Sequence, residues 1–167
     1  LIVIDSLTND RVCLAKGGHP LAVLQDMREP GTWVEFRFIS RIPGEDEGCR
    51  LQFKFCKAGQ LIYDLEFGWT NITIRNYIKV TSQFPVEPLH SMPSKGLFMS
   101  FEKHLYQLDW EETGPEGCYK LRFYGSDQDF TLFVHEESVR NFGRAFSKEW
   151  EHAPLTVLKG KRHTRKN

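Results

Sequence analysis

The sequence predicts an α+β domain, in which a mainly antiparallel sheet, made of a meander and a C-terminal hairpin, is packed by a C-terminal amphipathic helix. Three observations predict this class: short runs in which apolar and polar residues alternate, turn-forming residues between those runs, and one late stretch with helical apolar spacing. Of the 167 residues, 40% are hydrophobic and 13% aromatic, which suits a packed core and is atypical of disorder. We expect residues 1–158 to form a single domain.

Three consecutive segments show the period of two residues that is typical of strands with one face in water. In each of them apolar residues alternate with polar ones, and the apolar sets are Val34, Phe36 and Phe38, then Leu51, Phe53 and Phe55, then Tyr63, Leu65 and Phe67. Segment 43–48, rich in turn formers and acids, separates the first two, and residues 58–60 separate the last two. The three segments therefore predict an antiparallel meander.

The middle of the chain is harder to interpret. Ile72, Ile74, Ile78 and Val80 continue the alternation, and their β-branched side chains favour a further strand. Three prolines then predict a surface connection over residues 83–95. Between residues 95 and 108 the apolar residues fit both periods, and Ser94 in a capping position favours a second helix there.

The C-terminal third predicts a hairpin followed by a helix. Two alternating segments, centred on Leu121 and Leu132, flank a polar turn at 125–129. Residues 136–151 then show helical spacing, with two acids at the start and Pro154 beyond the end. We expect this helix to pack on the sheet through Val139, Phe142, Phe146 and Trp150, and Gly143 predicts a close approach to that sheet.

The formal charge is zero overall but uneven along the chain. Residues 1–158 contain 22 acidic and 17 basic residues, a net charge of −5, whereas residues 159–167 contain five basic residues and no acid. We expect this basic tail to be disordered. An acidic body repels phosphate, so nucleic-acid binding is disfavoured except through the tail.

No motif for catalysis, metal binding or cofactor binding is present. None of the six histidines lies in a known catalytic pattern, there is no phosphate-binding glycine loop or nucleophile elbow, and the four cysteines lack metal-ligand spacing. We therefore assign no catalytic residue, metal or cofactor and favour a protein without enzymatic activity. Free thiols and the lack of an apolar run long enough for a membrane span favour the cytoplasm.

The acidic body and the absence of catalytic motifs favour a non-catalytic protein-interaction module with a basic partner. The candidate binding residues form two acidic groups: Glu45, Asp46 and Glu47 in the first hairpin connection, and Asp109, Trp110, Glu111 and Glu112 further along. We interpret the second group as a solvated loop. In size, acidity and mixed architecture the chain is similar to small bacterial immunity proteins, an analogy of general character that would make it an inhibitor of a basic partner.

Two alternatives remain open at this point. One is a β-domain that binds a small ligand or acts as an enzyme, with an aromatic pocket lined by Trp33, Phe36, Phe53 and Tyr63. The other is a nucleic-acid accessory domain that acts through its basic tail. The pocket requires these aromatic rings to face a cavity, whereas the tail hypothesis requires only residues 159–167.

Overall fold

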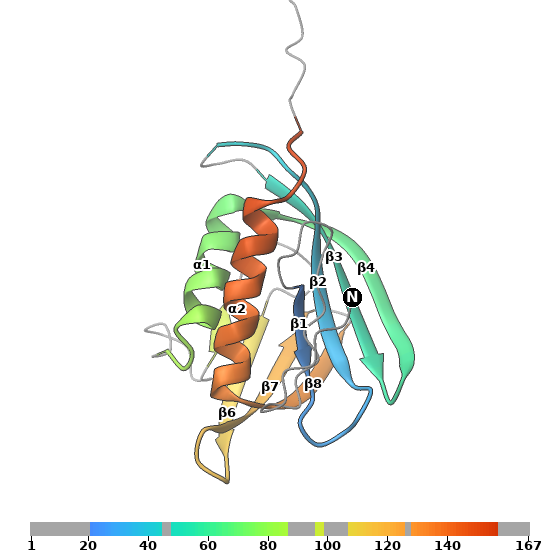
Figure 1. Ribbon diagram of the computed structural model, residues 1–167, viewed down its shortest axis with the longest axis vertical. Coiled ribbons are helices and arrows are strands. Elements are labelled where there is room, and N and C mark those ends of the chain that lie inside the picture. The colour runs from blue at the N-terminus through green and yellow to red at the C-terminus, as the bar shows by residue number, and fades with distance from the viewer. Residues whose placement is uncertain (1–20, 45–47, 87–95, 99–106, 126–127, 157–167) are drawn as a thin grey trace, which may run out of the picture.

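The protein is an α+β fold, and its described residues form two four-stranded antiparallel sheets and two helices (Figure 1). The computed structural model describes residues 21–44, 48–86, 96–98, 107–125 and 128–156, with the backbone alone for residues 96–98 and 107. The strand orders are β1-β2-β3-β4 and β5-β6-β7-β8. The predicted class, an antiparallel sheet packed by a C-terminal helix, is confirmed.

The first sheet contains the predicted meander, and each of its strands pairs with the next along the chain. It consists of β1 (Ala22–Gln25), β2 (Trp33–Arg41), β3 (Gly48–Lys57) and β4 (Gln60–Thr70). The short strand β1 was not predicted from the sequence. In β2 and β3 the predicted apolar positions face the core because every second side chain lies on the same face of a strand.

The strand predicted over residues 72–80 is wrong, because this segment forms helix α1 (Asn71–Ser82). Its buried side chains recur with helical spacing and include Ile74, Tyr77 and Thr81, whereas Ile72 is 51% exposed. The Thr70 hydroxyl accepts a hydrogen bond from the amide of Thr73 and caps the helix. Packing of this apolar face outweighs the weak helix propensity of the β-branched residues.

The second sheet contains β5 (Gly96–Phe98), β6 (Gln107–Thr113), β7 (Cys118–Tyr124) and β8 (Asp129–His135). The predicted hairpin is confirmed as β7 and β8. The helix predicted for residues 95–108 is wrong at both of its ends, because residues 96–98 and 107–108 form strands. Ser94 and residues 99–106 lie outside the described residues. Of the two periods that the apolar residues fit, the strand period is the one that describes the structure, because β6 has β5 and β7 as strand partners.

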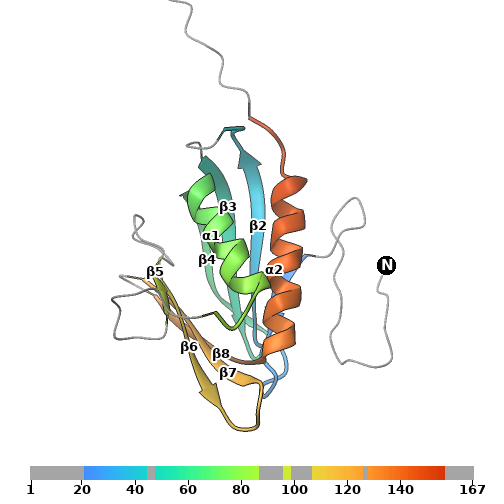
Figure 2. The ribbon, with the colours of Figure 1, turned by 90° about the vertical axis from the view of Figure 1, so that its left-hand side faces the viewer.

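The predicted C-terminal helix is confirmed as α2 (Glu136–Glu151). Its side chains Phe142 and Phe146 pack on the first sheet, with the Phe146 ring centroid 4.9 Å from that of Phe38. Figures 1 and 2 show α1 and α2 side by side on one face of this sheet, with the second sheet across its lower end. Gly143 makes its close approach to α1 and not to the sheet, which corrects the sequence-based interpretation.

The core is a continuous cluster of aromatic rings centred on Phe36 of β2. Its ring lies 5.6 Å from Tyr77 of α1, 5.6 Å from Phe146 of α2 and 6.3 Å from Phe123 of β7, measured between centroids. Below it, Phe55 of β3 stacks on Phe130 of β8 at 4.5 Å. Both helices and both sheets therefore share one core, and aromatic contacts of this kind add to the free energy of burial.

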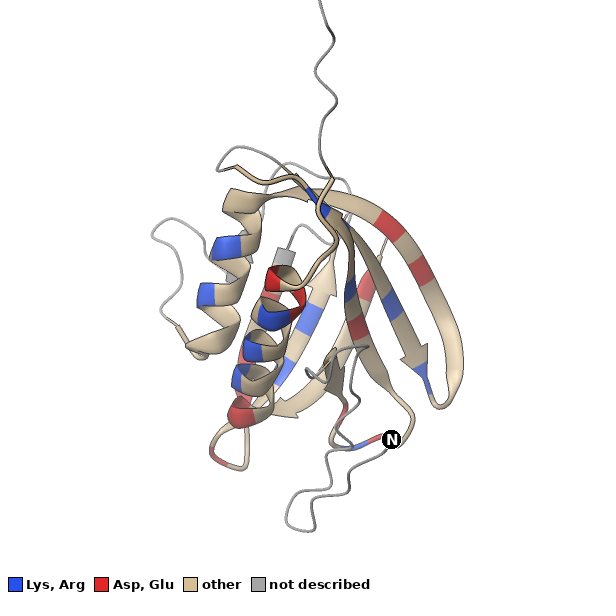
Figure 3. Ribbon diagram, turned by 45° about the horizontal axis from the view of Figure 1, so that its top comes forward, with Lys and Arg blue, Asp and Glu red and all other residues tan. Residues whose placement is uncertain are grey.

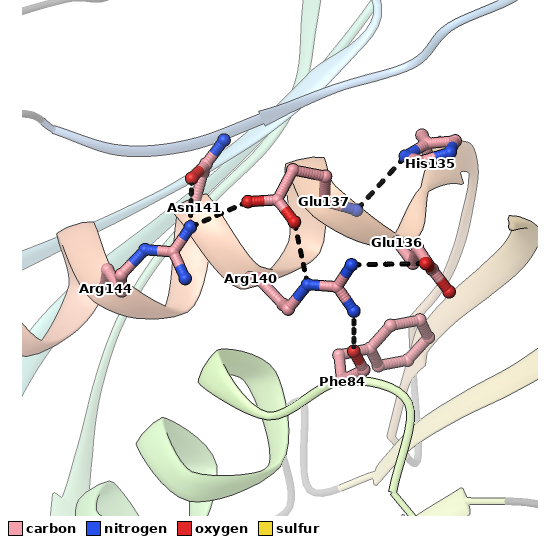
Figure 4. Close-up of polar contacts among 7 residues, drawn as sticks. All are labelled: Phe84, His135, Glu136, Glu137, Arg140, Asn141 and Arg144. Atoms are coloured by element: carbon pink, nitrogen blue, oxygen red, sulfur yellow. Dashed lines mark hydrogen bonds and ion pairs between the residues drawn. The ribbon is translucent and has the colours of Figure 1, made fainter.

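A network of charged side chains fixes the start of α2 to the segment after α1 (Figure 4). The Arg140 guanidinium donates to the carbonyl of Phe84 at 2.7 Å and to the carboxylates of Glu136 and Glu137. These hydrogen bonds hold the pKa of Glu137 below its ordinary value. Through Phe84, whose ring packs on Trp110 and Tyr119, the network also reaches the inner face of the second sheet.

The order of elements repeats along the chain, although no repeat is visible in the sequence. Four antiparallel strands are followed at once by a helix in each half, with β4 leading into α1 and β8 into α2. Both helices are capped by the last residue of the preceding strand: the Thr70 hydroxyl in the first half, and in the second the Nδ1 atom of His135, which accepts from the amide of Glu137 at 3.2 Å.

Candidate functional site

The candidate acidic residues divide between the described and the undescribed parts of the chain. Glu45, Asp46 and Glu47 lie outside the described residues. Asp109, Trp110, Glu111 and Glu112 lie in β6 and not in a solvated loop, so that interpretation is wrong. The turn begins only after Thr113, and it leads into β7.

The alternation within β6 sends neighbouring side chains to opposite faces of the second sheet. Leu108 and Trp110 are buried, and the Trp110 ring contacts Phe84 at a centroid distance of 5.6 Å. Asp109 and Glu111 are on the outer face, where Glu111 is exposed. Trp110 therefore contributes to the core, while the carboxylates carry the surface chemistry of this strand.

Basic residues of β7 lie directly across from two of these acids. Asp109 pairs in register with Arg122, and Glu111 with Lys120. Arg122 also forms a two-bonded ion pair with Asp129 of β8, at 2.8 and 2.7 Å, and this hydrogen bonding raises the pKa of Arg122, helped by the nearby charge of Asp109. The outer face of the second sheet is thus a set of alternating charges, and not a uniformly acidic surface.

Among the described residues, the second half of β6 has a strand partner on one side only. Strand β5 pairs only with residues 107–109, so no described strand pairs with residues 110–113 on the side away from β7. Glu111 and Glu112, both exposed, lie on this edge. An unpaired edge offers backbone hydrogen-bonding groups to a partner. Here the side chains beside that edge are negatively charged.

Further acids gather where β6 approaches the start of α2. Glu112 lies opposite Tyr119 in β7. The pKa of Tyr119 is raised, first by burial and then by the negative charges of Glu112 and Glu136, while Arg140 acts in the opposite direction. We define the acidic edge of β6 as Glu111 and Glu112. Of these, Glu112 lies near Tyr119, as does Glu136, whose carboxylate is paired with Arg140.

The four aromatic residues proposed to line a pocket do not share one cavity. Phe36 and Phe53 are fully buried and their centroids are 4.9 Å apart in edge-to-face contact. Tyr63 packs on Phe53 and Phe130 from the side. Trp33 lies on the opposite face of β2 from Phe36, because two residues lie between them and side chains alternate along a strand. Phe36 and Phe53 thus fill the core.

The cysteines of the described chain are free and buried: Cys49, Cys56 and Cys118. Cys49 donates a hydrogen bond from Sγ to Asn71 Oδ1, and burial raises the pKa of this thiol. Among the described residues no group of three or more His, Cys, Asp or Glu side chains is arranged to hold a metal ion. Cys13 lies outside them.

Comparison of the chain with protein-family models, with curated proteins and with solved structures found no match in any of the three. Neither described helix has the length and apolar character that crossing a bilayer requires. The basic tail, residues 159–167, lies outside the described residues. Just before it, Leu155 bridges to Arg41 at the end of β2.

Proposed function

We propose that the chain is a non-catalytic protein-binding domain that recognises a basic partner through the acidic edge of β6. The observation that carries this proposal is the position of Glu111 and Glu112, two exposed acids on a strand edge that no described strand covers. Complementary charge at an interface accelerates association and selects among partners. An inhibitor of the immunity-protein kind would fit such binding.

Two further features support a binding role in the cytoplasm. Residues 1–158 carry a net charge of −5, which favours the approach of a basic partner over that of an acidic one. The three described cysteines are unpaired thiols, as in proteins of a reducing compartment. The alternative of an aromatic pocket loses support because Phe36 and Phe53 fill the core.

Charge reversal on β6 tests this function directly. A tagged chain would capture proteins from a lysate of its source, and quantitative mass spectrometry would compare the wild type with Glu111→Lys/Glu112→Lys. We expect a basic protein to be captured by the wild type and lost from the variant, with intermediate loss for Glu111→Gln/Glu112→Gln. Circular dichroism would verify that each variant is folded.

The matched control is Glu137→Lys/Glu151→Lys, which makes the same change in charge at two exposed acids of α2. Loss confined to the β6 variant supports the assignment. Equal loss in both variants would show a response to net charge alone, and unchanged capture by the β6 variant would exclude this edge. Reversal of Glu45, Asp46 and Glu47 tests the other predicted acidic segment in the same assay.

A further inference from the structure

In the described part of the chain, strand β4 forms an open edge of the first sheet. With Gln60–Thr70 it is the longest described strand, and among the described strands it pairs only with β3 (Figure 1). Its free side presents a row of backbone amides and carbonyls. Such a row is a template for one more strand, from another protein or from a second copy of the chain.

The outer edge of β8, by contrast, is covered by the loop between β1 and β2. The amide of Met27 donates to the carbonyl of Phe133 at 2.8 Å, and the amide of Phe133 donates to Asp26 Oδ2 at 2.8 Å. The guanidinium of Arg28 lies 3.8 Å from the centre of the Phe133 ring. The loop between β1 and β2 therefore blocks strand addition at β8.

Strand β4 lacks two of the features that usually discourage strand addition, although its pairing with β3 shifts register beside Ile62 and it carries two acidic side chains. It contains no proline and no lysine, and two exposed apolar residues follow Gln60: Leu61 (53% exposed) and Ile62 (54% exposed). No basic residue occurs between positions 58 and 74. This stretch without basic residues is the feature of the sequence that marks β4 as an edge strand. The prediction of a meander did not identify it.

The outer face of β4 carries apolar and acidic side chains in a fixed order. Asp64 and Glu66 lie two residues apart and so share this face, and the exposed Ile62 lies at the register shift that precedes them. Both carboxylates are held by β3, since Asp64 accepts from Gln52 at 2.8 Å and Glu66 from Arg50 at 2.7 Å. Figure 3 shows these acidic positions (red) along the outermost strand, beside basic positions (blue) one strand inward.

This arrangement specifies the chemistry of an added strand. Side chains directly across from Asp64 and Glu66 would be roughly 5 Å away between Cβ atoms, while Arg50 and Lys54 on β3 would be about 5 Å further. Because the carboxylates are nearer, they determine which charge is favoured on the added strand. An added strand is therefore favoured when it places Lys or Arg opposite Asp64 and Glu66 and an apolar residue opposite Ile62.

A second copy of the chain fits this edge poorly. A two-fold pairing along the whole of β4 would be centred on Leu65, and it would set Asp64 of each copy opposite Glu66 of the other. Like charges directly across two strands are destabilising. The charge pattern thus favours a basic partner over self-association.

We propose that β4 binds an extended, basic segment of a protein partner by strand addition, through main-chain hydrogen bonds along Gln60–Thr70 and ion pairs to Asp64 and Glu66. This site lies on the other sheet from the acidic edge of β6. It shares with the proposed function only the expectation that the partner is a basic protein.

The test uses a fluorescent synthetic peptide of about nine residues in which Lys and Val alternate, a length that matches most of β4. Fluorescence anisotropy would measure its Kd for the full chain. We expect binding to weaken by about tenfold or more with Asp64→Lys/Glu66→Lys, and to be unchanged with Glu137→Lys/Glu151→Lys, which makes the same change in charge on α2. A peptide with Glu in place of Lys should not bind.

N-methylated peptides test strand addition on the wild-type protein, independently of whether a variant folds. Only alternate amides of an added strand point toward β4, so methylation of one alternate set should abolish binding while methylation of the other set spares it. Equal effects of the two sets, equal binding by both protein variants, or equal binding of the Glu peptide would overturn the proposal.

Two more outcomes separate this inference from its alternatives. Light scattering should show a monomer; a dimer whose dissociation constant changes in Asp64→Lys/Glu66→Lys would assign the edge to a second copy and overturn the proposal. Capture of a basic protein that depends on Glu111 and Glu112, with no binding of the peptide, would leave the proposed function standing and refute strand addition at β4.

Discussion

Gly143 of α2 lies against Thr81 of α1 so closely that a Cβ atom at position 143 would come within 2.5 Å of Thr81 Oγ1 and 2.6 Å of its carbonyl carbon. The added atom would also meet the backbone nitrogen of Ser82. These neighbours are mostly main chain, which cannot rotate away as a side chain does. The spacing of the two helices on the first sheet therefore depends on the missing side chain.

Gly143→Ala should destabilise the protein even though alanine is the better helix former. Helix propensity favours the substitution by about 1 kcal/mol. Separating the packed helices is expected to cost more, leaving a net loss of about 1–3 kcal/mol in the free energy of unfolding, measured by urea denaturation. Ser147→Ala on the same helix is the control and should change it by less than about 0.5 kcal/mol. A more stable Gly143→Ala protein would contradict this contact.

The sequence predicted most reliably the elements whose pattern is complete within a few residues. Alternation identified β2, β3, β7 and β8, because a strand with one wet face has a period of two. Helical spacing together with two initial acids identified α2 from Glu136 to Glu151. In each case the local pattern agreed with the tertiary packing.

Elements that depend on distant partners were missed or assigned to the wrong class. In α1 the β-branched residues favoured a strand, whereas its helical face is explained by tertiary contacts, among them those with Phe36 and with Gly143 of α2. The acids of β6 were identified as candidates for binding. Their position on an edge depends on where the short strand β5 ends, and local periodicity carries no such information.

Asp26 ties the first sheet to the second, and its loss should destabilise the protein. Its carboxylate accepts from the amides of Arg28 and Glu29 at 2.7 Å each and from the amide of Phe133 at 2.8 Å. Because hydrogen bonds to a charged group are strong, we expect Asp26→Ala to lower the free energy of unfolding by about 2–4 kcal/mol.

Asp26→Asn and Asp64→Ala complete this experiment. Asparagine keeps one acceptor oxygen but turns its amide nitrogen toward a backbone donor, so we expect an intermediate loss in the free energy of unfolding. Asp64 accepts a surface hydrogen bond from Gln52, and its conversion to Ala should change stability by less than about 1 kcal/mol. Equal effects at positions 26 and 64 in thermal or urea unfolding would refute the bridging role.

The Arg122 and Asp129 pair should contribute a pH-dependent increment of stability. Its hydrogen bonds lower the pKa of Asp129 in the folded state. A lowered carboxyl pKa stabilises the folded protein above the unfolded value of about 3.9, and this stability is lost as the pH falls through the folded value. The side chains are 42% and 54% exposed, so screening limits the contribution at neutral pH to about 0.5–1 kcal/mol.

A double-mutant cycle of Asp129→Asn and Arg122→Gln measures this contribution, with urea unfolding followed from neutral pH into the acid range. The coupling energy should be largest at neutral pH and low salt, and should vanish once Asp129 is protonated in both states. Added salt should reduce it, because the pair is partly exposed. A coupling energy that stayed constant through the acid range would mean that the bidentate contact between the two side chains does not persist in solution.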